Sequence, residues 1–233
     1  MTDVLIDIEG AARALEGEPA VDILRWASTR IPTLTFATGF GAEGCVIIDL
    51  IGRHRLPIDI FTLDTGLLFP ETYALWKQLE TTYGITIRGV APALTLEQQG
   101  AAHGAKLWES APDRCCELRK VAPLTDELRR FGAWVTAIRR DQTPERATAK
   151  VVETDRKFGI VKINPLATWT HDDVWAHLYA NDVPYNPLHE RGFPSIGCQP
   201  CTSPVVPGEN LRAGRWRGTG KNECGLHVAK ESK

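Results

Sequence analysis

Short apolar runs alternate with longer amphipathic stretches through the first 180 residues of this chain, and this alternation constrains the fold most. Four buried strands and a short fifth are predicted at residues 33–38, 58–63, 85–90, 134–138 and 162–166. Helices are predicted at residues 9–30, 45–55, 70–84 and 170–182. Strands that alternate with helices indicate an α/β class, with a doubly wound and mostly parallel sheet covered on both faces.

Polar turns follow three of the predicted strands, at residues 39–44, 64–66 and 139–146. In sheets of this kind, ligands bind outside the carboxyl ends of the strands. We therefore expect the three turns to meet at one rim and to form a binding site there.

The end of the chain has a different character. Residues 191–233 are rich in Pro, Gly and Arg and show little periodicity, which predicts a loop-rich C-terminal segment, part of it mobile. We expect residues 1–190 to form one α/β domain and residues 191–233 to be an appendage of it without independent folding.

Composition narrows the classes of function. The 233 residues include 27 basic and 29 acidic side chains, and a formal net charge of −2 argues against a general nucleic-acid binder. No apolar run approaches the roughly 20 residues that span a bilayer, so no membrane association is expected. The acidic N-terminus does not resemble a signal peptide, and a cytoplasmic location is predicted. Six cysteines in a reducing compartment favour ligands or catalysts over disulfides.

Four cysteines form two close pairs that are distant in sequence: Cys115 with Cys116, and Cys198 with Cys201 in a C-x-x-C pattern. Four thiolates in this pattern predict a metal site. Zinc is one candidate, but an adjacent Cys-Cys pair suits it less well than separate iron corners of a cluster, so the spacing favours iron–sulfur. Four structural thiols are the remaining alternative.

The other two cysteines differ from each other. Cys45 lies on an apolar predicted helix and is expected to be a core residue. Cys224 lies in the C-terminal segment between Lys221 and His227. A thiolate near cations is a good nucleophile, and a mobile arm could carry it into a site and out again. An inert exposed thiol is the alternative.

Features for binding an anion are also present. The turn "GFGAEG" lies between a strand and a helix, where backbone N–H groups can approach phosphate oxygens, although it is not a Walker sequence. The segments "RRDQTPER" and "RAGRWRG" add six arginines. So many arginines in a chain of slight negative charge suggest a small polyanionic ligand, while ion pairs with surface carboxylates remain the alternative for each one.

Together these motifs resemble the assimilatory sulfonucleotide reductases, the adenylyl-sulfate and phosphoadenylyl-sulfate reductase family of the PP-loop superfamily. The resemblance covers about residues 34–228 and rests on the segments "GFGAEG", "LDTG", "CCELRKVAPL", "RRDQTPER", "VPYNPLHERGFPSIGCQPCT", "RAGRW" and "ECGLH".

The resemblance implies an activity. Cys224 would attack the sulfur of an adenylyl sulfate and expel AMP, leaving an S-sulfocysteine, and thioredoxin or glutaredoxin would then release sulfite. Family members that keep Cys-Cys and C-x-x-C carry a [4Fe–4S] cluster and generally use adenylyl sulfate, so Cys115, Cys116, Cys198 and Cys201 are expected to hold such a cluster. Relatives are often dimers or tetramers, so a homo-oligomer is expected.

The resemblance also implies substrate contacts. Lys120 matches a lysine between cluster and sulfate, and Arg146 an arginine that contacts the nucleotide. The remaining matches are Thr38, Gly39, Phe40 and Gly41 in the phosphate turn, Leu63 and Thr65 near the adenosine, Arg212 and Arg215 over the substrate, and His227 in the closing tail.

Three rival functions stay open. The first is a reductase that prefers or also accepts the 3′-phosphorylated substrate. The second is a PP-loop ATP pyrophosphatase, against which the glycine turn and "ECGLH" argue. The third is a non-catalytic iron–sulfur redox sensor.

Overall fold

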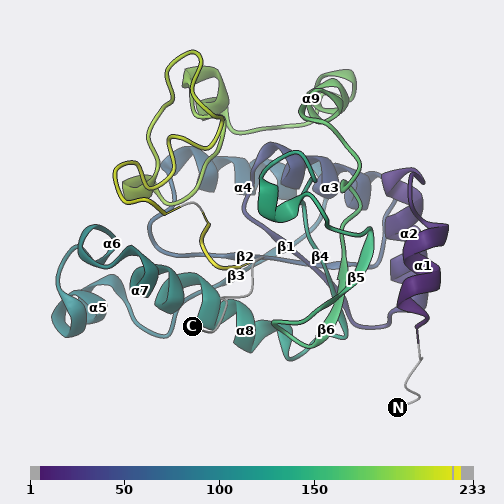
Figure 1. Cartoon of the computed structure of the whole chain (residues 1–233), viewed down its shortest axis with the longest axis horizontal. Helices are drawn as coiled ribbons and strands as arrows, with labels where there is room; N and C mark the ends of the chain where they lie inside the picture. Colours follow the sequence, from purple (N-terminus) through teal and green to yellow (C-terminus); the bar gives the residue numbers. More distant parts are fainter. Residues whose placement is uncertain (1–5, 222, 227–233) are drawn as a thin grey trace.

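The computed structural model describes residues 6–221 and 223–226, and it contains a six-stranded sheet (Figure 1). The strands are β1 (Leu34–Thr38), β2 (Asp59–Leu63), β3 (Ile87–Val90), β4 (Ala133–Val135), β5 (Val152–Asp155) and β6 (Ile160–Ile163), in the spatial order β3-β2-β1-β4-β6-β5. All neighbours are parallel except β5 and β6, which pair antiparallel at one edge. The predicted mostly parallel α/β sheet is confirmed.

The strand order reverses direction between β1 and β4. In space, β2 and then β3 lie on one side of β1, whereas β4 and then β6 lie on its other side. At such a switch point the loops after the two central strands turn apart and leave a crevice at the carboxyl edge of the sheet. The loops that follow β1 and β4 therefore flank the crevice.

Helices cover both faces of the sheet (Figure 1). On one side lie α3, α4 and α9, and on the other α5 to α8. The helices are α1 (Ile8–Ala14), α2 (Ala20–Arg30), α3 (Ala42–Arg53), α4 (Pro70–Tyr83), α5 (Leu96–His103), α6 (Leu107–Ser110), α7 (Pro112–Cys116), α8 (Ala122–Leu128) and α9 (His171–Ala180).

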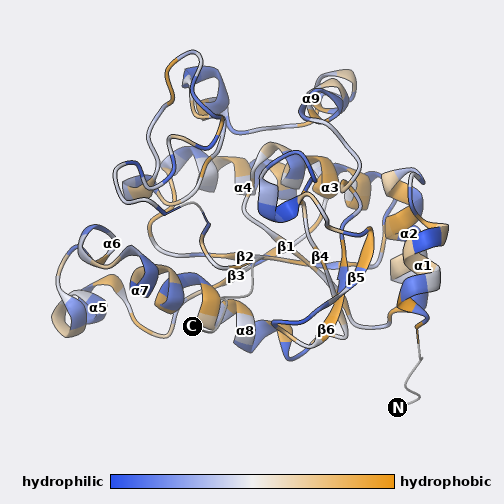
Figure 2. Ribbon diagram, in the orientation of Figure 1, coloured by the Kyte–Doolittle hydropathy of each residue, from blue (hydrophilic) through white to orange (hydrophobic). Residues whose placement is uncertain are grey.

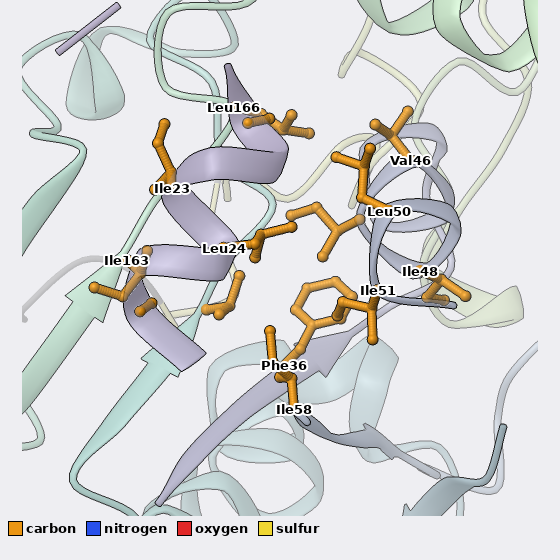
Figure 3. Packing of buried hydrophobic residues seen from close by; sticks show 14 of the residues in the cluster. Ile23, Leu24, Phe36, Val46, Ile48, Leu50, Ile51, Ile58, Ile163 and Leu166 are labelled. Atoms are coloured by element: carbon orange, nitrogen blue, oxygen red, sulfur yellow. The ribbon is translucent and has the colours of Figure 1, made fainter. Parts of the chain in front are cut away.

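The larger hydrophobic core lies between the sheet and α2, α3, α4 and α9 (Figure 3). Figure 2 shows apolar residues concentrated in α3, where buried residues run almost without interruption from Ala42 to Ile51. Side chains alternate along β4: Ala133 and Val135 join this core, whereas Trp134 faces the opposite side. There Trp134 packs with Phe61 and with Leu124 and Leu128 of α8 in a smaller cluster.

The prediction of one helix over residues 9–30 was wrong, because α1 ends at Ala14 and α2 begins at Ala20. Gly17 between them has φ +82°, a left-handed conformation that a helix cannot contain. Pro19 precedes the first residue of α2 and cannot donate a backbone N–H to a continuing helix.

Strand boundaries also differ from the prediction at the end of the sheet. β4 covers 133–135 instead of 134–138, and β6 covers 160–163 instead of 162–166, where Pro165 follows Asn164. The edge strand β5 was missed because its sequence, "VETD", is short and mostly polar. It ends the parallel sheet with an antiparallel pair that needs no crossover helix.

The described residues after α9 are rich in loops, which begin before the predicted start of the loop-rich segment at residue 191. They contain two short 3-10 helices, η3 (Pro187–Arg191) and η4 (Gln199–Cys201), and an isolated bridge between Thr202 and Arg215. In Figure 1 the yellow end of this segment runs back toward the sheet. In the part of the chain that the structure describes, no helix has the length and apolarity needed to cross a membrane.

Candidate active site

The glycine turn after β1 leads directly into α3. Phe40 has φ +56° and its N–H donates to the hydroxyl of Thr38 at 3.1 Å, which turns the chain sharply. Gly41 is the residue before α3 and offers no side-chain cap, so the first N–H groups of α3 point outward without a local acceptor. Such a helix start favours an anion. The aromatic ring of Phe40 is buried and stacks on Trp76, so only its backbone faces the rim.

The arginine-rich segment after β4 divides into two groups. Arg139 pairs with Glu43 and Asp141, and Arg140 pairs with Glu16 and donates to the carbonyl of Ala149. Both arginines form the ion pairs that were the alternative for each arginine, although Arg139 also lines the crevice. Arg146 belongs to the short 3-10 helix η2 (Pro144–Arg146) and lines the crevice too.

A cleft of about 300 Å³, here called the anion cleft, occupies the switch point. Its wall is made by the glycine turn, by the segment after β4 and by two parts of the loop-rich segment. The lining includes Gly39, Gly41, Arg146, His189, Arg212 and Arg215. Two of the three predicted turns thus meet at one rim, and four arginines line it, although Arg139 is already paired with Glu43 and Asp141.

Arg215 reaches the cleft because a glycine lies beneath it. A Cβ at Gly197 would stand 2.3 Å from the guanidinium of Arg215, so a residue without a side chain is required there. The guanidinium donates to the hydroxyl of Ser195 at 3.2 Å and stacks 4.5 Å from the ring centre of Trp216. Burial lowers the pKa of Arg215, and the like charge of Arg212 acts in the same direction.

The two cysteine pairs come from facing parts of the molecule. Cys115 and Cys116 end α7, while Cys198 directly precedes η4 and Cys201 ends it. The backbone N–H of Gln199 donates to the carbonyl of Leu67 at 2.7 Å and fixes η4 against the loop after β2. Cys198 Sγ lies 3.4 Å from the hydroxyl of Thr65 in the same loop. All four thiols are free in the structure.

The four thiols influence one another's pKa through their charges. Burial raises the pKa of Cys115, and negative charge on Cys116 and Cys198 raises it further. Burial has the largest effect on Cys201 and negative charge on Cys198 the second largest, and together they raise the pKa of Cys201 to about 11. Within residues 6–221 and 223–226, no three Cys, His, Asp or Glu side chains converge as ligands of a single ion.

The helix that carries Cys115 and Cys116 widens directly after them. Between α7 and α8 lies a π-helical turn, η1 (Glu117–Val121), and the chain stays helical throughout. Pro123 follows and cannot donate to the carbonyl of residue 119, which accounts for the altered hydrogen-bond pattern. Such π-turns are uncommon and are found often at functional sites.

The two basic residues of η1 have different roles. Arg119 is buried and donates to the carbonyl of Thr65 at 2.6 Å and to Gln99 at 3.1 Å, so it fixes the loop after β2. Lys120 faces a second pocket together with Cys224. Burial disfavours its charge, but thiolates at Cys198 and Cys224 outweigh burial and raise the pKa of Lys120.

This second pocket, here called the thiol pocket, has a volume of about 190 Å³. The carboxyl ends of β1 and β2 form one wall, Lys120 another, and the end of the chain the third. The lining includes Thr38, Leu63, Thr65, Lys120, Arg215 and Cys224. Gly39 and Arg215 line both the anion cleft and the thiol pocket, so the two spaces are adjacent.

Cys224 is held in the thiol pocket by contacts of its neighbours. The carboxylate of Glu223 pairs with Arg146 and Arg212, and Lys157 donates to the carbonyl of Gly225. Leu226 packs on the smaller hydrophobic cluster. The segment between "RAGRW" and Cys224 is therefore long enough to bring the thiol beside Lys120.

The structure brings nearly all predicted site residues to these two spaces. Gly39, Gly41, Arg146, Arg212 and Arg215 line the anion cleft. Thr38, Leu63, Thr65, Lys120 and Cys224 line the thiol pocket, and the four paired cysteines lie beside it. Phe40 departs from this because its ring is in the core. His227 lies outside the described residues.

Two residues of the candidate active site were not predicted from the sequence. His189 lines the anion cleft, and burial, the largest influence, lowers its pKa. Glu223 contacts two cleft arginines. Its negative charge directly before Cys224, in a segment otherwise flanked by basic residues, is the signal that could have identified it.

The comparisons with known proteins identify the family of the chain. Residues 33–204 match the family model described as "Phosphoadenosine phosphosulfate reductase domain". An adenosine 5′-phosphosulfate reductase of Halalkalibacterium halodurans is 43% identical over 226 residues, covering 96% of this chain and 98% of the relative. Adenosine 5′-phosphosulfate reductase 1 of Bacillus subtilis is 48% identical over 210 residues, or 89% and 90% of the two chains.

Solved structures show the same fold. The crystal structure of a phosphoadenylyl-sulfate reductase from Candida auris, a phosphate complex, superposes with a TM-score of 0.76 at 33% identity, covering 88% of this chain and 99% of that one. An FMN adenylyltransferase of Candida glabrata gives a TM-score of 0.53 at 17% identity over 84% and 64% of the two chains, a likeness of fold alone. The sheet, the rim and these matches together establish that the chain belongs to the phosphoadenosine phosphosulfate reductase domain family.

Proposed function

We propose that this protein reduces adenylyl sulfate to sulfite and AMP, with Cys224 as the nucleophile. The observation that carries the proposal is the position of Cys224, which shares one pocket with Lys120, Arg215 and the carboxyl ends of β1 and β2. The names of the relatives from H. halodurans and B. subtilis support the reaction and the substrate.

Binding would use both spaces of the site. The carboxyl ends of β1 and β2 and the loops after them, with Thr38, Gly39, Gly41, Leu63 and Thr65, would hold the nucleotide. Arg146, Arg212 and Arg215 would attract the anionic phosphosulfate, because guanidinium groups suit phosphate and sulfate oxygens. Lys120 would lie at the sulfate end, near the nucleophile.

In the first step the Cys224 thiolate attacks the sulfate sulfur. A new S–S bond forms, the bond from that sulfur to the bridging oxygen breaks, and AMP leaves with the oxygen and its electron pair. The arginines would stabilise charge on the departing phosphate, and Lys120 charge on the transferred sulfonate. The product on the protein is an S-sulfocysteine.

The second step needs an outside dithiol, for which thioredoxin or glutaredoxin chemistry is suitable. One of its thiolates attacks the Cys224 sulfur, and sulfite leaves with the electron pair of the S–S bond. The second thiol of the donor then closes its own disulfide and frees Cys224. Two electrons pass from the dithiol to the sulfur, so the balance closes without another reductant.

The four cysteines beside the pocket fit a [4Fe–4S] cluster. Their donor set is all thiolate, the adjacent pair Cys115 and Cys116 suits separate iron corners, and Lys120 interacts electrostatically with Cys116 and Cys198 as well as with Cys224. When bound, the cluster would supply a negative electrostatic environment at one end of the pocket. Lys120 would offset that charge and allow a sulfate to approach.

A second candidate is reduction of the 3′-phosphorylated substrate, favoured by the likeness to the Candida auris enzyme. The test is to measure sulfite formation with each substrate in the presence of a reduced dithiol donor. We expect kcat/KM to be higher for adenylyl sulfate. A higher kcat/KM for the 3′-phosphorylated form would support the second candidate, and no sulfite from either would refute the proposed reaction.

A further inference from the structure

Glu223, directly before the nucleophile, makes the contact that connects the tail to the anion cleft. Its Oε1 lies 2.9 Å from Nη2 of Arg146, and its Oε2 lies 3.3 Å from Nη2 of Arg212. All three side chains are largely buried, with exposed fractions of 13% for Glu223, 10% for Arg146 and 20% for Arg212. A carboxylate so enclosed is stable there because it is paired with the guanidinium groups.

The arginines also depend on this carboxylate. Burial lowers the pKa of Arg146, and the like charge of Arg212 lowers it further, whereas Glu223 opposes both effects. Glu223 is absent from the lining of the anion cleft, which contains both arginines. The carboxylate therefore pairs with two cleft arginines without itself lining the cleft.

Two further anchors hold the tail after Cys224. Lys157 donates to the carbonyl of Gly225, and Leu226 packs beside Phe61, Leu124, Leu128 and Trp134. These anchors fix the residues that follow Cys224 in the sequence. Glu223, which precedes Cys224, is fixed by the same arginines that face the anion cleft.

We propose that Glu223 is a positioning residue, which docks the tail onto Arg146 and Arg212 and so presents Cys224 to a substrate anion held by those arginines. The inference rests on the proposed function for its catalytic consequence. Docking itself is a property of the folded chain and can be measured without turnover.

The first experiment measures docking. Hydrogen exchange of tail peptides that contain Gly225 and Leu226 would be followed by mass spectrometry in wild type, Glu223→Gln and Glu223→Asp. Loss of a charge-assisted contact of this kind predicts exchange at least about 10-fold faster in Glu223→Gln. Glu223→Asp keeps the charge and should restore part of the protection. Unchanged exchange in Glu223→Gln would overturn the inference, whatever the enzyme's activity.

The second experiment measures the chemical step. Each protein, purified without oxygen, would be mixed with saturating adenylyl sulfate and no dithiol, and the rate of sulfonate addition followed by intact mass. Misplacement of a nucleophile by about 1 Å costs on the order of 100-fold in rate, so a large decrease is expected in Glu223→Gln. AMP should bind at least as tightly as to wild type, because removal of the carboxylate leaves the arginines more attractive to anions.

The same segment offers a control variant that leaves the contacts of Glu223 intact. Glu209→Gln breaks the pair with Arg217 in the same segment, outside both pockets, and should change neither exchange nor rate. A wild-type rate in Glu223→Gln, or AMP binding weakened by the same factor as the rate, would contradict the positioning role. No adduct in wild type would refute the proposed function instead, while the exchange result would still decide whether Glu223 docks the tail.

Discussion

The two sides of the active site are built by different forces. The α/β body is held by apolar burial, with Phe36, Val46 and Leu24 fully excluded from solvent. The loop-rich segment after α9 closes the site with polar contacts, such as the guanidinium of Arg215 over Gly197 and the pair of Glu223 with Arg146. The first side fixes the shape of the rim, and the second places the charged groups and the thiol on it.

This difference has a functional consequence. A core of packed side chains has one low-energy arrangement, and local opening of it is costly. A segment held by a few ion pairs and a single apolar contact opens at lower cost. In the proposed reaction Cys224 must meet first a nucleotide and then an outside dithiol, so a weakly held tail on a rigid body suits both requirements.

The largest effect should come from the tail itself. Cys224→Ser removes the proposed nucleophile and should lower sulfite formation at least about 1000-fold, because a serine hydroxyl without a base is a poor nucleophile. AMP binding and the free energy of unfolding should stay close to wild type. The measurement is sulfite release with a reduced dithiol donor, and residual activity near wild type would remove Cys224 from its role.

The next effect concerns the junction between the two sides. Cys198→Ser removes a proposed cluster ligand from the loop-rich segment, and we expect iron per chain and the visible absorbance of the protein to fall strongly. Cys45→Ala is the matched control, because Cys45 is a buried core thiol of α3. Equal iron content in Cys198→Ser and wild type would contradict the ligand assignment.

A pair of leucines compares the two sides directly. Leu24 is fully buried in the core, and Leu24→Ala should lower the free energy of unfolding by about 2–5 kcal/mol. Leu226 is half-buried on the tail, and Leu226→Ala should lower it by no more than about 1 kcal/mol while slowing adduct formation on Cys224. Urea denaturation gives both free energies. Equal losses of stability would mean that the tail belongs to the core.

The smallest expected change lies within the body and depends on pH. Asp49 is fully buried, and burial alone would raise its pKa, but hydrogen bonds from His177, Arg53 and Tyr83 outweigh burial and lower it. A lowered folded-state pKa means that this carboxylate stabilises the fold above its unfolded pKa of about 3.9, and that the contribution is lost as pH falls through the folded value.

Asp49→Asn should therefore lower the free energy of unfolding at pH 7 by about 1–3 kcal/mol and reduce the loss of stability on acidification. Asp126→Asn, which changes an exposed pair with Arg129, is the control. Denaturation curves from pH 3 to pH 7 give the comparison. An unchanged acid dependence in Asp49→Asn would show that other carboxylates govern it.

The sequence allowed the body to be predicted better than the closing segment. β1 and β2 are short runs of mostly apolar and β-branched residues with a turn directly after each, so their ends and the rim could be inferred. β5 could not, because an edge strand of four residues, two of them acidic, lacks that pattern. The break at Gly17 in the predicted first helix was overlooked, although a glycine followed by Pro19 was visible.

The site shows the same division. The cysteine pairs, Lys120 and the cleft arginines carried a family pattern and could be named in advance. Which arginines pair with carboxylates depends on contacts over long sequence distances, such as Arg140 with Glu16. The π-turn that arises from Pro123 within a helix directs the side chains of Arg119 and Lys120 to different partners. These directions can be seen only in the structure.

The central claim is that Cys224 accepts the sulfonate of adenylyl sulfate. The direct test is to mix anaerobically purified protein with adenylyl sulfate in the absence of any dithiol, then to obtain the intact mass, the modified peptide and the iron content from one sample. We expect one SO3 group per chain, located on Cys224, in a protein that contains iron. An iron-loaded protein that stays unmodified, or one that carries the group on another residue, would contradict it.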